Sequence, residues 1–479
     1  MPRDTPITQL PHQVEGTEFL RRNERAALFD EQGLGKSKQL IDAIAAQIAD
    51  GELAGAVIVC PNGLKTNWAE EIAKFSNLPV AVFGAGRKAR RSSFAKLRAA
   101  FYVINYEAVG AELASLKALL RFKPMALVLD ESHRIKTPEA RVTEAVLQLR
   151  ASASRRYILS GTPVANKPDD LWSQFYFLDD GDTLGTTLAE FRKRYRSEGG
   201  GYAALDDLRD RVEGMSKRRL KEHAVALPAK RVSRLRLEMT GRQRELYHEM
   251  RNELAIWVES LEGDQVLRQA EAILARLVRL AQLASDPSML DASYDEEPCK
   301  FAALDALMDE ALARPAARKV IVWTSFVANI SSLERRYARH RPVSLHGALT
   351  GPQRDASVRA FKQDPEVRLM VANPAAAREG LTLTEANVAI YLDRTFNLVD
   401  YLQSQDRIHR ISQTRECEIV LLVAKDSVDE FVDFCLEQKT RLARFVQQDV
   451  DTVQPADLAL EKPEILRALL WPEGEAGPS

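Results

Sequence analysis

The sequence predicts an α/β fold in which two parallel-sheet lobes are separated by a helical insertion. Short apolar runs typical of buried strands alternate with helical patterns in two blocks along the 479 residues. Such alternation is typical of parallel sheets covered by helices on both faces. Between the blocks, from about Val164 to Pro298, apolar residues recur at three- and four-residue steps, which favours helices. A chain of this length is expected to hold about three domains.

The individual elements follow from the apolar pattern. Strands of the first block are expected near Ala27, Ala56, Val80, Tyr102, Leu127 and Tyr157, and those of the second are VIVW, VSL, VRLMV, VAIYL and EIVLLV. One insertion helix carries Tyr247, Met250, Leu254, Trp257 and Leu261. After a break at Gly263-Asp264, a second carries Leu274, Leu277, Val278 and Leu280. We interpret both stripes as core, because apolar residues at helical spacing usually face the interior.

The string GLGKS, Gly33 to Ser37, is expected at the turn between the first strand and a helix that begins near Lys36. Backbone N–H groups of Gly33, Leu34 and Gly35 at such a turn can approach phosphate oxygens closely. Lys36 would bridge the β- and γ-phosphates of a nucleotide, and the Ser37 hydroxyl would bind magnesium. Asp30 stands where the general phosphate-loop pattern has its first glycine. The alternative is an ordinary turn that caps a helix.

A second string, DESH, follows the apolar run Met125 to Leu129, so Asp130 and Glu131 are expected at the carboxyl end of a buried strand. That end is the ligand side of an open α/β sheet. Asp130 would hold magnesium, and Glu131 would polarise the attacking water. The alternative is a solvated acidic turn that caps the next helix.

A third string, QSQDRIHR, contains Arg407 and Arg410. If the string is helical, their three-residue spacing places both guanidiniums on one face. Together with the first two strings, this favours a pair of arginine fingers that neutralise charge on a transferring phosphoryl group. Without the first two strings, an ordinary basic helix face would be the better interpretation of Arg407 and Arg410.

Composition limits the remaining possibilities. The chain has 67 Lys and Arg against 68 Asp and Glu, so no field of the whole protein attracts a polyanion. Binding to DNA would then rest on local basic patches, for which the candidates are Arg87-Lys88 with Arg90-Arg91, FRKRYR from Phe191, and SKRR from Ser216. Four scattered cysteines indicate neither a zinc site nor a disulfide framework, which favours a reducing compartment. No signal peptide or membrane span is expected.

Taken together, the motifs resemble helicase superfamily two, and within it the Swi/Snf family of DNA translocases. The resemblance runs from about Leu10 to Val423 and includes LPHQVEGTEFL, VCPNGLKTNWAEEIAKF, VINYE, DESHRIKT, LSGTP, KVIVWTSF, GLTLTEAN and QSQDRIHRISQ. The HRIK extension is the most diagnostic part. Ala376 and Ala377 replace paired glycines and Thr382 replaces an asparagine that relatives carry, and in this the motif resembles the compact bacterial or phage, annealing-helicase-like branch. Thr137 replaces the usual asparagine after HRIK, a polar exchange expected to be mild.

The resemblance implies two RecA-like lobes and a set of site residues. Its domains would be an ATP-binding lobe at 1–165, a helical insertion and crossing at 166–298, a second lobe at 299–450 and a tail at 451–479. Gln13 would read adenine, and Gly380 would also contact nucleotide. Coupling of hydrolysis to DNA would involve His133, Ser160, Thr162 and Gln403. The DNA contacts would include Lys65, Trp68, Asn105 and Lys136.

The function implied by the resemblance is ATP-dependent translocation on double-stranded DNA, independent of sequence and without processive unwinding, with ATP and Mg²⁺ as cofactors. A monomeric motor in the cytoplasm, or in the nucleus of a eukaryote, is expected. Two alternatives stay open: a strand-separating DNA or RNA helicase, and a non-catalytic DNA-binding clamp or regulatory subunit.

Overall fold

The fold is described from a computed structural model that covers residues 9–84, 99–197, 201–261, 265–313, 319–378 and 380–450. These residues form two compact units, one containing residues 9–226 and 441–450 and the other residues 227–440. Within the described ranges, no helix is long and apolar enough to cross a membrane.

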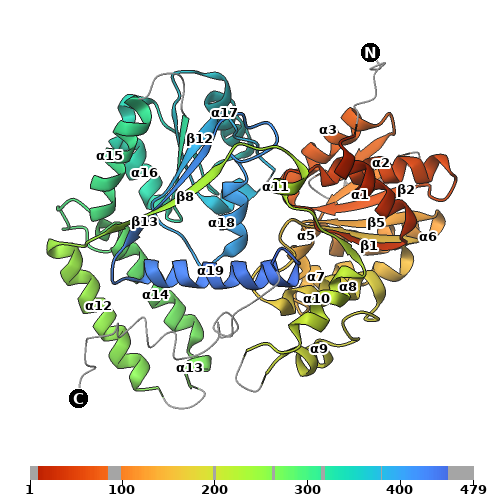
Figure 1. Cartoon of the computed structure of the whole chain (residues 1–479), viewed down its shortest axis with the longest axis horizontal. Coiled ribbons are helices and arrows are strands. Elements are labelled where there is room, and N and C mark those ends of the chain that lie inside the picture. Colours follow the sequence, from red (N-terminus) through yellow and green to blue (C-terminus); the bar gives the residue numbers. More distant parts are fainter. Residues whose placement is uncertain are drawn as a thin grey trace. The chain divides into compact units, whose positions relative to one another are not determined.

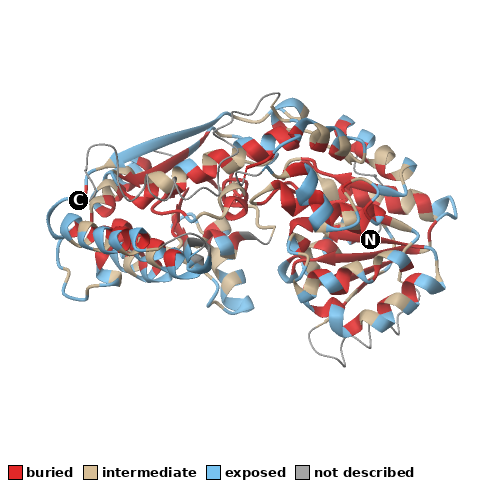
Figure 2. Ribbon diagram, turned by 90° about the horizontal axis from the view of Figure 1, so that it is seen from below, coloured by how far each residue is buried: buried red, intermediate tan, exposed pale blue. Residues whose placement is uncertain are grey.

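The first unit is built on a parallel sheet, which has seven strands in the described residues, in the order β3-β4-β2-β5-β6-β1-β7. The strands are β1 (Arg25–Leu28), β2 (Gly55–Cys60), β3 (Val80–Val82), β4 (Phe101–Asn105), β5 (Met125–Asp130), β6 (Arg155–Leu159) and β7 (Ser216–Lys217). β2, and β5 as far as Leu129, are continuous apolar runs buried on both faces, as expected for parallel strands inside an α/β lobe. Figure 2 shows this burial along the strands.

Helices cover both faces of this sheet (Figure 1). The longer ones are α1 (Pro11–Arg22), α2 (Lys36–Ala49), α3 (Lys65–Phe75), α6 (Leu113–Phe122), α7 (Arg141–Leu147), α8 (Trp172–Asp179), α9 (Leu188–Tyr195) and α10 (Leu205–Glu213); short turns are α5 (Tyr106–Val109) and α11 (Lys221–Ala224). Apolar residues of α1, α2 and α3 form one core with alternate residues of the strands. Alternation places the remaining strand residues on the opposite face, where α6 and α8 pack.

The second unit contains a parallel sheet of six strands within the described residues, in the order β10-β11-β9-β12-β13-β8. These are β8 (Lys230–Leu237), β9 (Lys319–Trp323), β10 (Val343–Leu345), β11 (Leu369–Ala372), β12 (Ala386–Tyr391) and β13 (Cys417–Ala424). Its helices are α12 (Gly241–Glu259), α13 (Gln265–Arg268), α14 (Ala270–Ser285), α15 (Cys299–Ala313), α16 (Val327–Arg336), α17 (Gly351–Gln363), α18 (Leu398–Gln405) and α19 (Val428–Val446), of which α19 continues past this unit. One core lies against α15 and α16, and another includes Phe361 of α17.

The predicted fold class is confirmed: two parallel-sheet lobes of RecA-like type, with every expected strand present. Helices α12 and α14 occur where the apolar stripes predicted them, and the break at Gly263-Asp264 lies outside the described residues. The interpretation of the stripes as core holds for Tyr247, Leu254, Leu277 and Leu280. It is wrong for Leu274 and Val278, which are 50% and 43% exposed because α14 packs along α12 with only one of its faces. The predicted domain limits stay a prediction.

Candidate nucleotide site

Three predicted motifs of the first unit meet at one edge of its sheet. The phosphate loop follows β1, Asp130 ends β5, and Ser160 follows β6. The three strands run parallel, with β6 paired to both β1 and β5. Their carboxyl ends therefore lie together, which is where ligands bind in open α/β sheets.

The phosphate loop has the backbone conformation that its glycines predict. Gly33 and Gly35 have φ of +93° and +78°, which only glycine adopts without strain, and α2 begins at Lys36. A Cβ on Gly35 would lie 2.5 Å from Nε2 of Gln13. Gln13 Nε2 donates to the Leu34 carbonyl at 3.3 Å, and Gln13 Oε1 accepts from the Leu10 N–H at 3.1 Å. Gln13 therefore supports the loop directly, and its reading of adenine stays a prediction.

Lys36 turns its ammonium back into the loop. Its Nζ donates to the Asp30 carbonyl oxygen at 2.7 Å. Desolvation lowers the pKa of Lys36, and the nearby carboxylates of Glu131, Asp30 and Asp130 oppose that shift. The ammonium is thus held by backbone oxygen within a group of acidic side chains, where an arriving phosphate would have to compete for it.

Asp30, the departure from the general loop pattern, is fully buried and paired. Its carboxylate accepts two hydrogen bonds from Arg219, at 2.9 and 2.7 Å, and one from Gln39 at 3.0 Å. Arg219 belongs to the segment that leaves the first unit, so this pair ties that segment to the start of the phosphate loop. The partner lies 189 positions away in sequence, and spacing alone could not indicate it.

Asp130 is held at both carboxylate oxygens. The Trp68 indole N–H donates to Oδ2 at 2.8 Å, and the Glu131 backbone N–H donates to Oδ1 at 3.0 Å. Burial, followed by the neighbouring Glu131 charge, raises the pKa of Asp130 to about 7. Trp68 is only 1% exposed, so its side chain is buried rather than available for the predicted DNA contact. We assign the Trp68 indole to positioning Asp130.

Glu131 has a left-handed backbone conformation with φ of +51°, an arrangement that costs on the order of 1–3 kcal/mol for such a residue. Its Oε1 accepts from Gln32 Nε2 at 2.6 Å, and its Oε2 lies 3.4 Å from Nδ1 of His133. The same ring nitrogen lies 3.4 Å from the Ser160 hydroxyl. The alternative of a helix-capping acidic turn fails, because Glu131 precedes a short 3-10 helix and its side chain makes no capping bond.

The raised pKa of Asp130 predicts that Asp130→Asn stabilises the nucleotide-free protein. The unfolded aspartate titrates near pH 4 and the folded one near 7, so the parent loses stability as pH rises between these values. Removing the charge should raise Tm by at least about 2–4 °C at pH 8, the shift that 1 kcal/mol produces in a lobe of this size. Thermal unfolding in EDTA at pH 8 and at pH 4 measures this. The same Tm difference between the parent and Asp130→Asn at pH 8 and at pH 4 would contradict this prediction.

The remaining coupling and DNA candidates of this unit lie near the same edge. Thr162 is buried, and its backbone N–H donates to the Ser160 hydroxyl at 3.1 Å. Lys65 Nζ donates to the Phe83 carbonyl at 2.9 Å and to Asn105 Oδ1 at 3.4 Å. Lys136 is half-buried, and its charge acts on buried Asp170. Their predicted DNA contacts stay predictions.

In the second unit, the prediction that Arg407 and Arg410 lie on a helix is wrong. Helix α18 ends at Gln405 and both arginines lie in the following turn, because the Arg407 carbonyl accepts from Leu383 N–H at 2.9 Å instead of continuing the helix. Arg407 Nε and Nη1 donate to the carbonyls of Gln403 and Leu381. Its side chain is 1% exposed.

Arg410 lies on the same turn with a less buried side chain. It donates to the Asp406 carbonyl at 2.9 Å, to the Thr382 hydroxyl at 2.8 Å and to the Gly380 carbonyl at 3.5 Å. Thr382, one of the departures from the resembled pattern, thus supplies an acceptor for Arg410. Gly380 has φ of +64°, a conformation that suits glycine.

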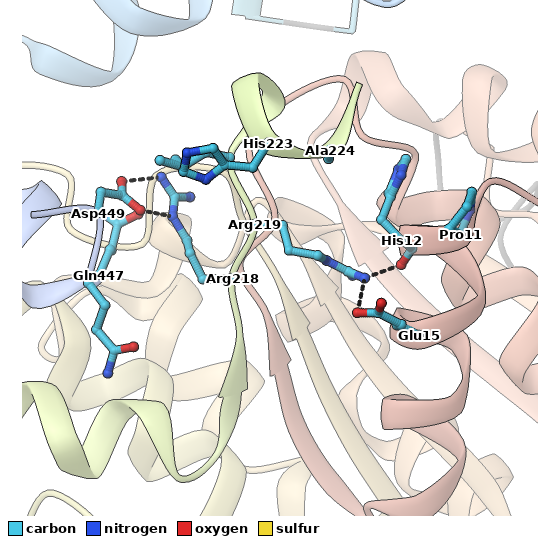
Figure 3. A pocket seen from close by; sticks show the side chains of 11 residues that line it. Pro11, His12, Glu15, Arg218, Arg219, His223, Ala224, Gln447 and Asp449 are labelled. Atoms are coloured by element: carbon cyan, nitrogen blue, oxygen red, sulfur yellow. Dashed lines mark hydrogen bonds and ion pairs between the residues drawn. The ribbon is translucent and has the colours of Figure 1, made fainter. Parts of the chain in front are cut away.

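The basic strings proposed as DNA patches are largely paired inside the protein. Arg218 makes a bidentate ion pair with Asp449 at 2.9 and 2.7 Å. Figure 3 shows this pair and Arg219 beside a pocket of about 400 Å³. In FRKRYR, Arg192 and Arg196 both bind Asp169. The patch from Arg87 to Arg91 lies outside the described residues. Arg218 and Arg219 therefore form ion pairs within the first unit, and the DNA contacts of the basic strings stay predictions.

The first unit is an α/β lobe with a phosphate-loop motif, an acidic pair and a buried tryptophan that orients Asp130. A second α/β lobe with an arginine-bearing turn follows it in the chain. Residues 12–289 match the model of the SNF2-related domain, and residues 299–412 match that of the helicase conserved C-terminal domain. The chain belongs to the SNF2-related family, as its motifs predicted.

Similar proteins come from distant organisms. The chain is 25% identical to chromodomain-helicase-DNA-binding protein 1-like of Danio rerio, over 95% of this chain and 46% of that protein. It is 28% identical to the putative ATP-dependent helicase/translocase YwqA of Bacillus subtilis, over 91% of this chain and 48% of that protein. The chain thus spans about half the length of these curated relatives. The solved SWI2/SNF2 ATPase core of Sulfolobus solfataricus in complex with dsDNA is 26% identical, covering 98% of both chains, with a TM-score of 0.45.

Proposed function

We propose that the protein hydrolyses ATP and uses the energy to move along double-stranded DNA without separating its strands. The observation that carries the proposal is the grouping of phosphate loop, acidic pair and Ser160 at one sheet edge of the first unit. Membership of the SNF2-related family supports the coupling to DNA.

Magnesium fits the residues at this edge. Asp130 and the Ser37 hydroxyl offer the hard oxygen ligands that Mg²⁺ prefers. Two adjacent carboxylates are buried there, and Oε2 of Glu131 has no hydrogen-bond partner, so a cation would relieve uncompensated negative charge. When bound, Mg²⁺ would neutralise charge on the phosphate oxygens.

The chain's own residues would then do the following. Lys36 would leave the Asp30 carbonyl to bind the β- and γ-phosphates, and Glu131 would accept a hydrogen bond from the attacking water. Arg407 and Arg410 would act on the γ-phosphate when the two lobes close, since charge that develops in phosphoryl transfer needs neutralising. His133 Nδ1 lies 3.4 Å from both Glu131 Oε2 and the Ser160 hydroxyl, which supports a role in passing a change at the proposed DNA-coupling motif to the base.

We propose double-stranded DNA as the partner because the chain belongs to this family and has the HRIK extension. One relative is also named as a DNA-binding protein. Contacts to the phosphate backbone would give no sequence preference. A strand-displacement experiment tests the output: with ATP and Mg²⁺, the protein should release the third strand of a triplex and leave a forked duplex paired. Ready unwinding of the fork with an intact triplex would favour the helicase alternative, and no DNA-stimulated hydrolysis would favour the clamp.

Glu131→Gln should separate binding from chemistry. The amide keeps the size of the side chain and can still contact Gln32, but it cannot serve as a base. Turnover should fall by about 10²–10⁴-fold, the usual contribution of a general base, while affinity for a fluorescent ATP analogue with Mg²⁺ stays within about twofold. A parallel loss of affinity would instead make Glu131 a metal-binding or structural residue.

A further inference from the structure

Gln32, a phosphate-loop residue with no role in the chemistry above, makes a short hydrogen bond to the predicted base. Its Nε2 donates to Glu131 Oε1 at 2.6 Å, and the two residues are 8% and 9% exposed. The bond joins the loop after β1 to the end of β5, across 99 positions of sequence. A hydrogen bond that a buried carboxylate accepts is among the stronger ones in proteins.

The position of Gln32 places this bond beside the groups that would hold the γ-phosphate. A Cβ built on Gly161 would lie 2.8 Å from Gln32 Cγ and 3.5 Å from Lys36 Nζ. Gly161 therefore makes room for the Gln32 side chain, and Lys36 Nζ lies at ordinary van der Waals distance from the same position. Gln32 thus bonds the carboxylate expected to polarise water and lies near the ammonium expected to bind phosphate.

The bond occupies an oxygen that the chemistry needs. A general base must offer a lone pair to the attacking water within hydrogen-bond reach. Oε1 of Glu131 accepts from Gln32, and Oε2 is buried without a hydrogen-bond partner, 3.4 Å from His133 Nδ1, so neither oxygen faces solvent for an attacking water. Lys36 is engaged in the same way, with its Nζ on the Asp30 carbonyl. Glu131 Oε1 and Lys36 Nζ are thus both bound to protein atoms.

We propose that Gln32 is a positioning residue that restrains Glu131 in a conformation unfit for attack until nucleotide and DNA have docked. The inference rests on the proposed ATPase function and concerns the regulation of that site. Closure on DNA would enforce the competent conformation of Glu131 and override the restraint. The restraint would therefore act mainly in the absence of DNA, where it lowers the rate of ATP hydrolysis.

The test is Gln32→Met, which keeps the length of the side chain and removes its N–H donor. Loss of a charge-assisted hydrogen bond changes the balance of two conformers by about tenfold or more. We expect kcat without DNA to rise about tenfold, while KM for ATP and kcat at saturating DNA change less than about twofold. The ratio of the two rates, which is the DNA stimulation, should fall accordingly. Gln32→Ala should do the same and guards against a packing effect specific to methionine.

Gln47→Met is the matched control, because Gln47 is a buried glutamine of the same lobe that donates to the Tyr157 hydroxyl and does not contact Glu131. Its DNA stimulation should equal that of the parent, with folding of all variants checked by thermal unfolding. An unchanged stimulation ratio in both Gln32 variants overturns the proposal, and so does a parallel fall of both rates, which would mean that Gln32 orients the base for attack. A parent without DNA-stimulated hydrolysis would instead refute the proposed function.

Discussion

Lys36→Ala should reduce ATP turnover about a thousandfold and weaken ATP binding as well. Removing one preorganised group that stabilises developing charge costs about 10²–10³-fold in kcat, and Lys36 would also contact phosphates in the ground state. The variant should fold normally, because the Lys36 ammonium is bound only by loop carbonyls that solvent can satisfy after its removal. Release of phosphate with saturating duplex DNA measures the rate, and a fluorescent ATP analogue measures the affinity.

Lys38→Ala provides the matched control for this experiment. Lys38 lies two positions further along α2 and pairs with Asp42 at 2.7 Å, away from the phosphate loop. Turnover of the control should stay within about twofold of the parent. If Lys36→Ala kept most of the DNA-stimulated rate, GLGKS would be a helix-capping turn and the nucleotide site would lie elsewhere.

The strands and the placement of the motifs could be predicted because they depend on local pattern. Met125 to Leu129 is apolar throughout and ends in two acids, so both the strand and the position of Asp130 follow from adjacent residues. The Gly35 conformation follows in the same way from the need for a positive φ. Such features require no knowledge of what packs against them.

Contacts between distant segments could not be predicted. The Trp68 indole appeared as a DNA contact from its motif, yet it is buried against Asp130, 62 positions away. The same holds for Arg219, which binds Asp30, and for Gln32, which binds Glu131. In each case the side chain carries a hydrogen-bond donor that could also face solvent, and only the fold brings its partner near.

The end of α18 could not be predicted from the sequence for a different reason. QSQDRIHR has no glycine or proline to stop a helix, so helical spacing of Arg407 and Arg410 was the natural prediction. The helix ends because the Arg407 carbonyl accepts from the Leu383 N–H instead of from a later residue of the same helix. A tertiary hydrogen bond thus decides the local structure, and it changes what each arginine contacts.

Those contacts predict different consequences for the two arginines. Arg407→Ala would remove a buried guanidinium and leave the carbonyls of Gln403 and Leu381 without their donors. Each buried acceptor left unsatisfied costs about 1–3 kcal/mol, so the variant should unfold at a lower temperature than the parent. Arg410→Ala should cost less stability, because Arg410 is more exposed.

Arg410→Ala therefore gives the cleaner test of the chemical role. If its guanidinium neutralises charge on the γ-phosphate only when the lobes close, binding of ATP and of DNA should each stay within about twofold of the parent. Turnover should fall about 10³–10⁵-fold, the contribution of an arginine finger to phosphoryl transfer. Triplex displacement should stop with it, because movement depends on hydrolysis.

Arg415→Ala is the control for Arg410→Ala, since Arg415 lies five positions further on and donates to the Glu385 carbonyl. It should keep the rate of the parent, whereas Arg410→Ala should lose the rate with a smaller fall in Tm than Arg407→Ala. A double variant lacking both Arg407 and Arg410 that remained folded and kept turnover within about threefold of the parent would rule out the finger assignment. The turn after α18 would then have to act on DNA or on lobe stability, and the group that neutralises the γ-phosphate would have to be sought on another segment of the second lobe.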